Sequence, residues 1–270
     1  LDKKNLRDNA LHEIEKVEWI PKNSKNRIKS MVQERPDWCV SRQRSWGVPI
    51  TIFLSKENGE PLRNKKVNER ILNVIKAEGI DSWFSRPVKY FLQDLEDSSQ
   101  YEKVQSILDV WFDSGSSHVY VLKNKGIGDQ ADLYLEGSDQ HRGWFQTSLL
   151  ESCAIYKESP YKSVLTHGFV IDDKGRKMSK SLGNIILPSD IIKKYGADIL
   201  RIWVASSNYA EDLRIDYSIL DQHADSYRKI RNTFRYLLGN INDNFENINL
   251  HELNLAELPE LEQFMLHKIF

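Results

Sequence analysis

Two short apolar runs, 133–135 and 164–170, are separated by a segment of helical length, and this pattern most limits how the chain can fold. Turn residues follow each run, as expected for buried parallel strands. The segment between them, 140–156, has a broad apolar face. A strand, a helix and a second strand at this spacing form a βαβ unit, which places two parallel strands in one sheet beneath helices. The sequence therefore predicts an α/β fold.

Helical patterns occupy both ends of the chain. Near the start, Ser24 can cap a helix that ends before Pro36. After a third apolar stretch at 199–205, the segment 220–238 predicts one long amphipathic helix, and 257–270 predicts another. The α/β region is therefore expected to run into an α-helical region.

The segment 54–105 differs from its surroundings. Residues 55–66 are polar and include Gly59 and Pro61, which favour a surface hairpin or loop. Residues 93–103 are acidic and polar. We expect this whole segment to be a peripheral insertion rather than part of the core.

The composition excludes several classes of protein. Hydrophobic residues make up 40% of the chain and charged residues 29%, as in globular proteins. The apolar runs are shorter than the roughly 18 residues that span a bilayer, and the charged start is unlike a signal peptide. Cys39 and Cys153 lie far apart, which favours a reducing compartment. We expect a cytoplasmic protein without membrane anchor or bound zinc; the net charge of −1 leaves nucleic acid open as a partner.

The string Lys-Met-Ser-Lys-Ser at 177–181 is the first candidate for chemistry. It follows a predicted strand and a turn, so it lies on a loop at the end of the sheet where ligands bind. Lys177 and Lys180 suit a nucleotide polyphosphate and the negative charge that develops on a leaving pyrophosphate. A solvated basic loop is the plain alternative for a lysine-rich segment. This string is more specific, because chance produces it on the order of once in ten thousand chains of this length.

The block 134–144 is the second candidate, because it lies where a strand ends and a helix begins. Gly137 permits close approach of the backbone to a ligand, and Ser138 or Asp139 can cap the helix. The backbone amides of the first helical turn then face the crevice at the end of the sheet where ligands bind. Asp139 is also placed to bind a ribose hydroxyl. Taken singly, Asp139 could be only a cap, and His141 with Arg142 could be surface groups.

The lysine string, with Leu-Gly-Asn after it and Thr-His-Gly-Phe before it, resembles the second signature of the class I aminoacyl-tRNA synthetases. The resemblance implies ATP-dependent activation of an amino acid followed by its transfer to tRNA. In the family the lysine that matches Lys180 contacts ATP, and the lysine that matches Lys177 also contacts the phosphates. The block 134–144 looks like the aminoacyl-adenylate site of the isoleucine members. The ATP- and adenylate-binding residues implied in this way are Glu136, Gly137, Asp139, Gln140, His167, Gly168 and Lys180.

Two further blocks, 38–49 and 108–115, are rich in aromatic residues. Such density usually indicates core packing, which we expect for Phe112. Both blocks also resemble segments that flank the active site in the isoleucine, valine and leucine members. The residue sequence of 109–115, together with that of 136–144, favours isoleucine. The resemblance implies that Trp111 and Trp144 line the pocket for the isoleucine side chain.

The resemblance implies an isoleucine–tRNA ligase, with tRNA(Ile), isoleucine and ATP as its partners. Magnesium would come with ATP, and no residue of the chain is assigned to a metal. Residues 1–205 would be the later half of a Rossmann-type catalytic domain. Residues 206–270 would connect it to a helical anticodon-binding domain and begin that domain.

The first family signature, His-Ile-Gly-His, does not occur in the sequence, and the editing domain is missing. We therefore expect a piece of a monomeric enzyme that is inactive alone. A valine-type synthetase, a nucleotidylyltransferase for another substrate, and a non-catalytic fragment that binds RNA or a partner remain alternatives.

Three arginines of the segment 220–238 fall at i, i+3 and i+7 and therefore lie along one side of the predicted helix. They are Arg228, Arg231 and Arg235. From spacing alone, a solvated polar face is equally compatible. The resemblance favours contact with the tRNA backbone.

Overall fold

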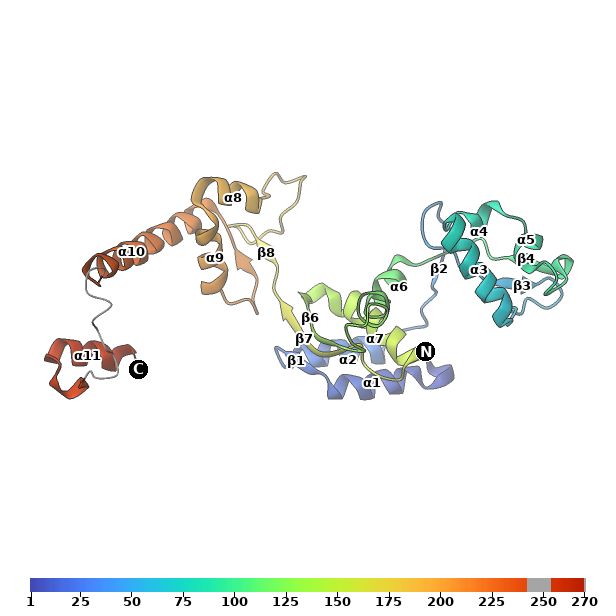
Figure 1. The fold of residues 1–270 in the computed structure, drawn as a ribbon, viewed down its shortest axis with the longest axis horizontal. Helices are drawn as coiled ribbons and strands as arrows, with labels where there is room; N and C mark the ends of the chain where they lie inside the picture. The colour runs from blue at the N-terminus through green and yellow to red at the C-terminus, as the bar shows by residue number, and fades with distance from the viewer. Residues whose placement is uncertain (242–253, 270) are drawn as a thin grey trace. The chain divides into compact units, whose positions relative to one another are not determined.

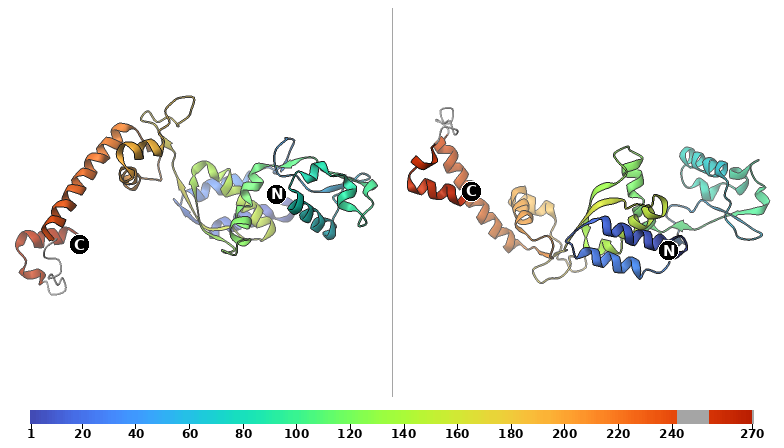
Figure 2. Two further views of the ribbon diagram at one scale, coloured as in Figure 1. Left: turned by 45° about the horizontal axis from the view of Figure 1, so that its top comes forward. Right: turned by 90° about the horizontal axis from the view of Figure 1, so that it is seen from below.

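The computed structural model describes residues 1–241 and 254–269 (Figures 1 and 2). The chain forms two compact units. The first unit is Leu1–Phe169 with Ala210–Asp212, and the second is Val170–Tyr209 with Leu213–Phe270. The functional division at 205/206 is a different boundary and stays a prediction.

A three-stranded parallel sheet forms the centre of the first unit. Its strands, in spatial order, are β1 (Glu18–Ile20), β7 (Tyr161–His167) and β6 (Ala131–Gly137). Val164 in the middle strand is the register partner of both Trp19 and Tyr134. The parallel pairing of β6 and β7 confirms the α/β fold predicted from the apolar runs.

Helices cover the face of the sheet that carries Trp19, Tyr134 and Val164, which are buried (Figure 1). These helices are α1 (Leu6–Lys16), α2 (Ser24–Gln33) and α7 (Trp144–Ile155). On β6, Leu133 and Leu135 alternate with the buried tyrosine and are 45% and 51% exposed. This alternation follows from the two-residue period of a strand.

The segment predicted to be an insertion has a small core of its own, centred on Phe53, Trp83 and Phe91. Its elements are β3 (Phe53–Ser55), α3 (Lys65–Glu78), α4 (Ser82–Ser85), α5 (Val88–Leu92) and β4 (Tyr101–Lys103). The strands β3 and β4 pair antiparallel. A short antiparallel ladder, β2 (Ser41–Arg42) with β5 (Ile107–Leu108), joins the segment to α6 (Val110–Gly115) and the rest of the unit.

The second unit is mainly helical. Strand β8 (Val170–Ile171) pairs parallel to β9 (Leu213–Arg214). The helices of this unit are α8 (Pro188–Tyr195), α9 (Ala197–Ser206), α10 (Tyr217–Ile241) and α11 (Glu260–Ile269). The third apolar stretch of the sequence lies in α9, and Ile199 and Trp203 of that helix pack against Leu220 of α10. Within the ranges described, no helix combines the length and apolarity needed to cross a membrane.

Candidate active site

The turn after β6 is built from a 3₁₀ segment, Ser138–His141, followed by α7. The helix begins at Trp144, later than the sequence indicated, so neither Ser138 nor Asp139 caps it. That expectation was wrong. The side chain of Gln140 caps α7 instead, because its Oε1 accepts the Trp144 amide at 2.9 Å. Asp139 Oδ2 accepts Gln140 Nε2 at 3.2 Å, which turns the amide oxygen toward the helix.

The predicted ligand-binding residues of this turn lie at the carboxyl end of β6. Glu136 and Asp139 have exposed side chains, whereas Gly137 is buried. Glu136 Oε2 accepts the Gly137 amide at 3.3 Å. Exposed carboxylates at the end of a parallel strand are available to hydroxyl groups of a ligand.

His141 is buried rather than a surface group. Its Nδ1 lies 3.0 Å from the carbonyl oxygen of Ser138, so Nδ1 carries the proton and donates it. Its ring stacks on Trp19 and meets Phe145 edge-on. Burial lowers the pKa of His141. The neutral imidazole of His141 therefore packs the turn against the face of the sheet that the helices cover.

The structure brings both predicted pocket tryptophans to the start of α7. The ring of Trp111 lies against Gly143, where an added Cβ would fall 2.9 Å from two of its ring carbons. Trp144 stacks on Tyr134 with ring centroids 3.9 Å apart, and its Nε1 donates to Ser117 Oγ at 2.9 Å. Trp111 is 41% exposed, so part of its side chain remains accessible.

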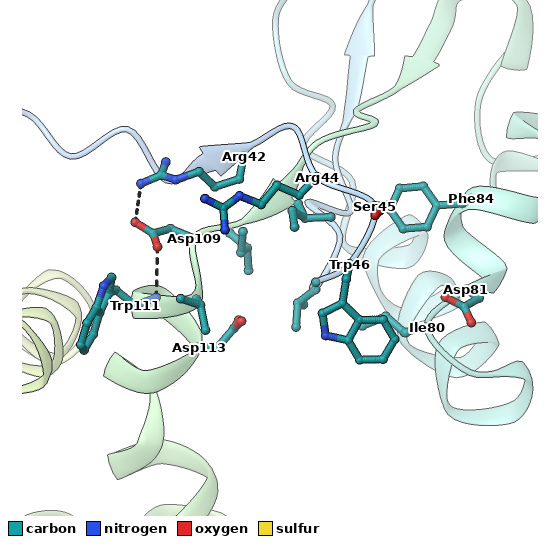
Figure 3. A pocket seen from close by; sticks show the side chains of 15 residues that line it. Arg42, Arg44, Ser45, Trp46, Ile80, Asp81, Phe84, Asp109, Trp111 and Asp113 are labelled. Atoms are coloured by element: carbon teal, nitrogen blue, oxygen red, sulfur yellow. Dashed lines mark hydrogen bonds and ion pairs between the residues drawn. The ribbon is translucent and has the colours of Figure 1, made fainter. Parts of the chain in front are cut away.

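A cavity of about 740 Å³ lies beside Trp111 (Figure 3). Arg44 and Trp46 line it from the segment after β2, Asp113 lines it from α6, and Phe84 of α4 lines it from the insertion (Figure 3). Trp46 is 90% exposed. Burial, and then the negative charge of Asp109, raise the pKa of Asp113. The cavity therefore combines aromatic surface with groups of both charges.

The end of β7 is held close to the segment 210–212. A Cβ on Gly168 would lie 2.1 Å from the carbonyl oxygen of Glu211, so only glycine fits there. The next amide, of Phe169, donates to Asp212 Oδ1 at 2.8 Å. His167 Nδ1 lies 2.7 Å from the Gly168 carbonyl oxygen. The predicted adenylate-binding pair His167 and Gly168 thus lies in a backbone fixed by close packing.

The lysine loop belongs to the second unit, and Lys177 and Lys180 are exposed on it. Hydrogen bonds of Asp172 and Asn184 hold the backbone of the loop in place. Asn184 Nδ2 donates to Asp172 Oδ2 at 2.9 Å and to the Lys177 carbonyl oxygen at 3.3 Å, while its Oδ1 accepts the Ser179 amide at 2.9 Å. The hydrogen bond from Asn184, with those from Arg176, holds the pKa of Asp172 far below its ordinary value.

The three arginines of α10 have exposed side chains in the second unit. Arg228 forms an ion pair with Asp225 one turn earlier, which the spacing argument did not consider. Part of the positive charge of this helix side is therefore neutralised locally. A carboxylate three residues before an arginine was the signal for this pair.

One comparison identifies the family of the chain. Residues 1–216 match the family described as tRNA synthetases class I (I, L, M and V). The chain belongs to this family. The resemblance to the class I aminoacyl-tRNA synthetases is thereby confirmed, whereas the adenylate-binding role of the block 134–144 stays a prediction.

Isoleucine–tRNA ligases are among the similar proteins. That of Pelagibacter ubique is 59% identical over 98% of this chain and 29% of its own length. That of Zymomonas mobilis is 54% identical over 98% of this chain and 28% of its own length. The chain thus spans less than a third of these relatives.

The structure of a leucine enzyme from Agrobacterium radiobacter K84, solved as a ternary complex with tRNA and LeuAMS, has a similar fold. Its TM-score is 0.58 at 20% sequence identity, over 77% of this chain and 29% of that one. At this identity the match supports the fold class alone.

Proposed function

We propose that the chain is the later half of the catalytic domain of an isoleucine–tRNA ligase, followed by the start of a helical tRNA-binding region. The reaction joins isoleucine and ATP into isoleucyl-adenylate and pyrophosphate, then transfers isoleucine to tRNA(Ile). The identity of 59% with an isoleucine ligase across nearly the whole chain carries this proposal.

In the first step, the isoleucine carboxylate attacks the α-phosphate in line with the leaving pyrophosphate, so no protein nucleophile is needed. Catalysis then depends on positioning and on charge stabilisation. Lys177 and Lys180 supply positive charge to the pyrophosphate from a loop whose backbone is braced by Asn184. Magnesium, carried in with ATP, would neutralise further phosphate charge.

The turn after β6 would hold the adenylate. Asp139 presents an exposed carboxylate for the ribose hydroxyls, and Glu136 presents another for the aminoacyl part. Gln140 acts here through its fixed orientation between Asp139 and the α7 amide. Gly137, His167 and Gly168 would bring backbone close to the nucleotide.

Trp111 and Trp144 would provide the apolar walls of the amino-acid pocket. Such walls exclude larger side chains sterically. One missing methylene costs only about 1–3 kcal/mol in an apolar pocket, a limit for which isoleucine enzymes are themselves the usual example. Valine is therefore the competitor that tests this pocket most severely.

The proposal is tested in a hybrid ligase, in which this chain replaces the matched segment of the Pelagibacter ubique ligase. We expect pyrophosphate exchange that depends on isoleucine, weakly on valine, and not on leucine or methionine. The isolated chain should show none, because a nucleotide site in this fold class is shared between two halves of the sheet. A folded hybrid ligase that prefers another amino acid, or has no exchange, would refute the proposal.

A further inference from the structure

The carboxylate of Asp109 joins the segment 38–42 to the start of α6 at the edge of the cavity (Figure 3). Its Oδ2 accepts Trp38 Nε1 at 3.1 Å and Arg42 Nη2 at 2.5 Å. Its Oδ1 accepts the Trp111 amide at 3.2 Å, which caps the N-terminus of α6. Asp109 is 6% exposed, so these donors replace the water that a carboxylate would otherwise bind.

The same network continues into α7. Arg35 lies over the ring of Trp38, 5.5 Å from its centroid, and its Nη1 donates to Gln146 Oε1 at 2.5 Å. The backbone amide of Asp109 also donates to the carbonyl oxygen of Val40 at 2.7 Å. The segment 35–42 is thereby fixed both to α7 and to the start of α6.

The start of α6 determines where Trp111 lies. Trp111 is the second residue of that helix, and its amide is the one that Asp109 accepts. Its ring packs on Gly143, beside the Gln140 oxygen that caps α7. A shift of the α6 terminus would therefore move the ring away from the turn that carries Gln140.

We propose that Asp109 is a positioning residue that sets the pocket wall formed by Trp111, and so the selectivity for isoleucine over valine. This role rests on the proposed function. Asp109 acts through Trp111 and does not itself contact the substrate. It also links that wall to Arg42 of the β2–β5 ladder, which connects the insertion to α6.

The test variant is Asp109→Asn in the hybrid ligase. Asparagine keeps the size and one acceptor oxygen but loses the charge that binds Arg42, and it cannot accept from all three donors. We expect the KM for isoleucine to rise about 10-fold or more, with a smaller change in the KM for ATP and a lower preference for isoleucine over valine. Hydrogen exchange of residues 110–115 should also become faster.

Asn64→Ala is the matched control. Asn64 caps α3 within the insertion, where its Oδ1 accepts the Lys66 amide at 3.0 Å. Removing this cap destabilises a helix start of the same unit that lies in the insertion core and not at the pocket wall. We expect it to leave the KM for isoleucine and the preference over valine unchanged.

Faster hydrogen exchange of residues 110–115 with unchanged isoleucine KM and unchanged selectivity would overturn the positioning role. Hydrogen exchange of these residues that stays as slow as in the parent would overturn it too. A parent hybrid ligase without isoleucine-dependent exchange activity would overturn the proposed function and this role together. The parent measurement therefore separates the two failures.

Discussion

The indole ring of Trp111 occupies the space where a side chain at Gly143 would begin, at the point where the turn after β6 becomes α7. A Cβ at position 143 would fall 2.9 Å from two carbons of this ring and 2.6 Å from Gln140 Oε1. Gly143 is thus enclosed by one predicted pocket residue and one predicted adenylate-site residue. The contact joins two blocks that are separate in the sequence.

Gly143→Ala should displace Trp111, Gln140 or both, because real Cβ atoms do not approach heavy atoms so closely. We expect the KM for isoleucine in the hybrid ligase to rise by about 10-fold or more, since small misplacements in a binding site have large effects. Gly59→Ala is the control, because nothing lies within 4 Å of a Cβ there, although its φ of +71° gives it some strain of its own. An unchanged isoleucine KM in Gly143→Ala would contradict the assignment of Trp111 to the pocket.

Lys180→Ala should lower the rate of isoleucine-dependent pyrophosphate exchange by about 10²-fold or more, as expected for the loss of one preorganised charge at the transition state. The KM for ATP should change less. Lys193→Ala, on an exposed position of α8, controls for the loss of a surface lysine in the same unit. A main effect on KM with the rate intact would make Lys180 a ground-state binding residue only.

Asn184→Asp should damage the lysine loop more than Asn184→Ala. The alanine removes the contacts to Ser179, Lys177 and Asp172. The aspartate keeps an acceptor for the Ser179 amide, but it places a second carboxylate beside Asp172, where the amide nitrogen of Asn184 now donates at 2.9 Å. Like charges at this distance repel. We expect pyrophosphate-exchange rates to fall by about 10-fold for alanine and further for aspartate, and equal effects would mean that charge repulsion between Asp172 and the new carboxylate is unimportant.

Glu151 of α7 should make the stability of the chain depend on pH. Burial, and then the charge of Asp113, raise the pKa of Glu151 to about 8 from 4.5. Between these values the unfolded chain releases the proton while the folded chain keeps it, so stability falls as pH rises and levels off above about pH 8.

Glu151→Gln removes this dependence at nearly constant size. The thermal midpoint of the variant should match that of the parent near pH 4.5 and exceed it increasingly up to pH 8. At pH 8 the free energy of unfolding of the variant should be higher by about 1–3 kcal/mol. Glu57→Gln, at an exposed position of the insertion, is the control. Parallel curves for parent and variant would show that Glu151 ionises normally.

Reversing Arg228, Arg231 and Arg235 of α10 to Glu should weaken tRNA binding and flatten its dependence on salt, because fewer counterions are released. Adenylate formation should remain nearly unchanged. Arg231 and Arg235 alone should produce most of the effect, since Arg228 already pairs with Asp225. Unchanged tRNA affinity at moderate salt would assign these arginines to a solvated face.

Local sequence was sufficient for the parallel pairing of β6 and β7 and for the family, because apolar periodicity and contiguous motifs are properties of neighbouring residues. The expected place of the lysine loop, directly after a strand of that sheet, was wrong, because the loop follows β8 of a separate two-stranded sheet in the second unit. The cap of α7 was not predictable in this way. Ser138 and Asp139 are good capping residues, but a 3₁₀ turn delays the helix until the Gln140 side chain reaches its first amide.

Only the tertiary structure decided which distant side chains meet. Asp109 binds Trp38 and Arg42, which precede it by 71 and 67 residues, and the intervening insertion folds around its own core. The burial of His141 and the position of Trp111 on Gly143 likewise depend on how α2, α6 and α7 pack. Residue types and spacing identify groups that can form hydrogen bonds, whereas their partners are chosen by the packing of elements that no local pattern specifies.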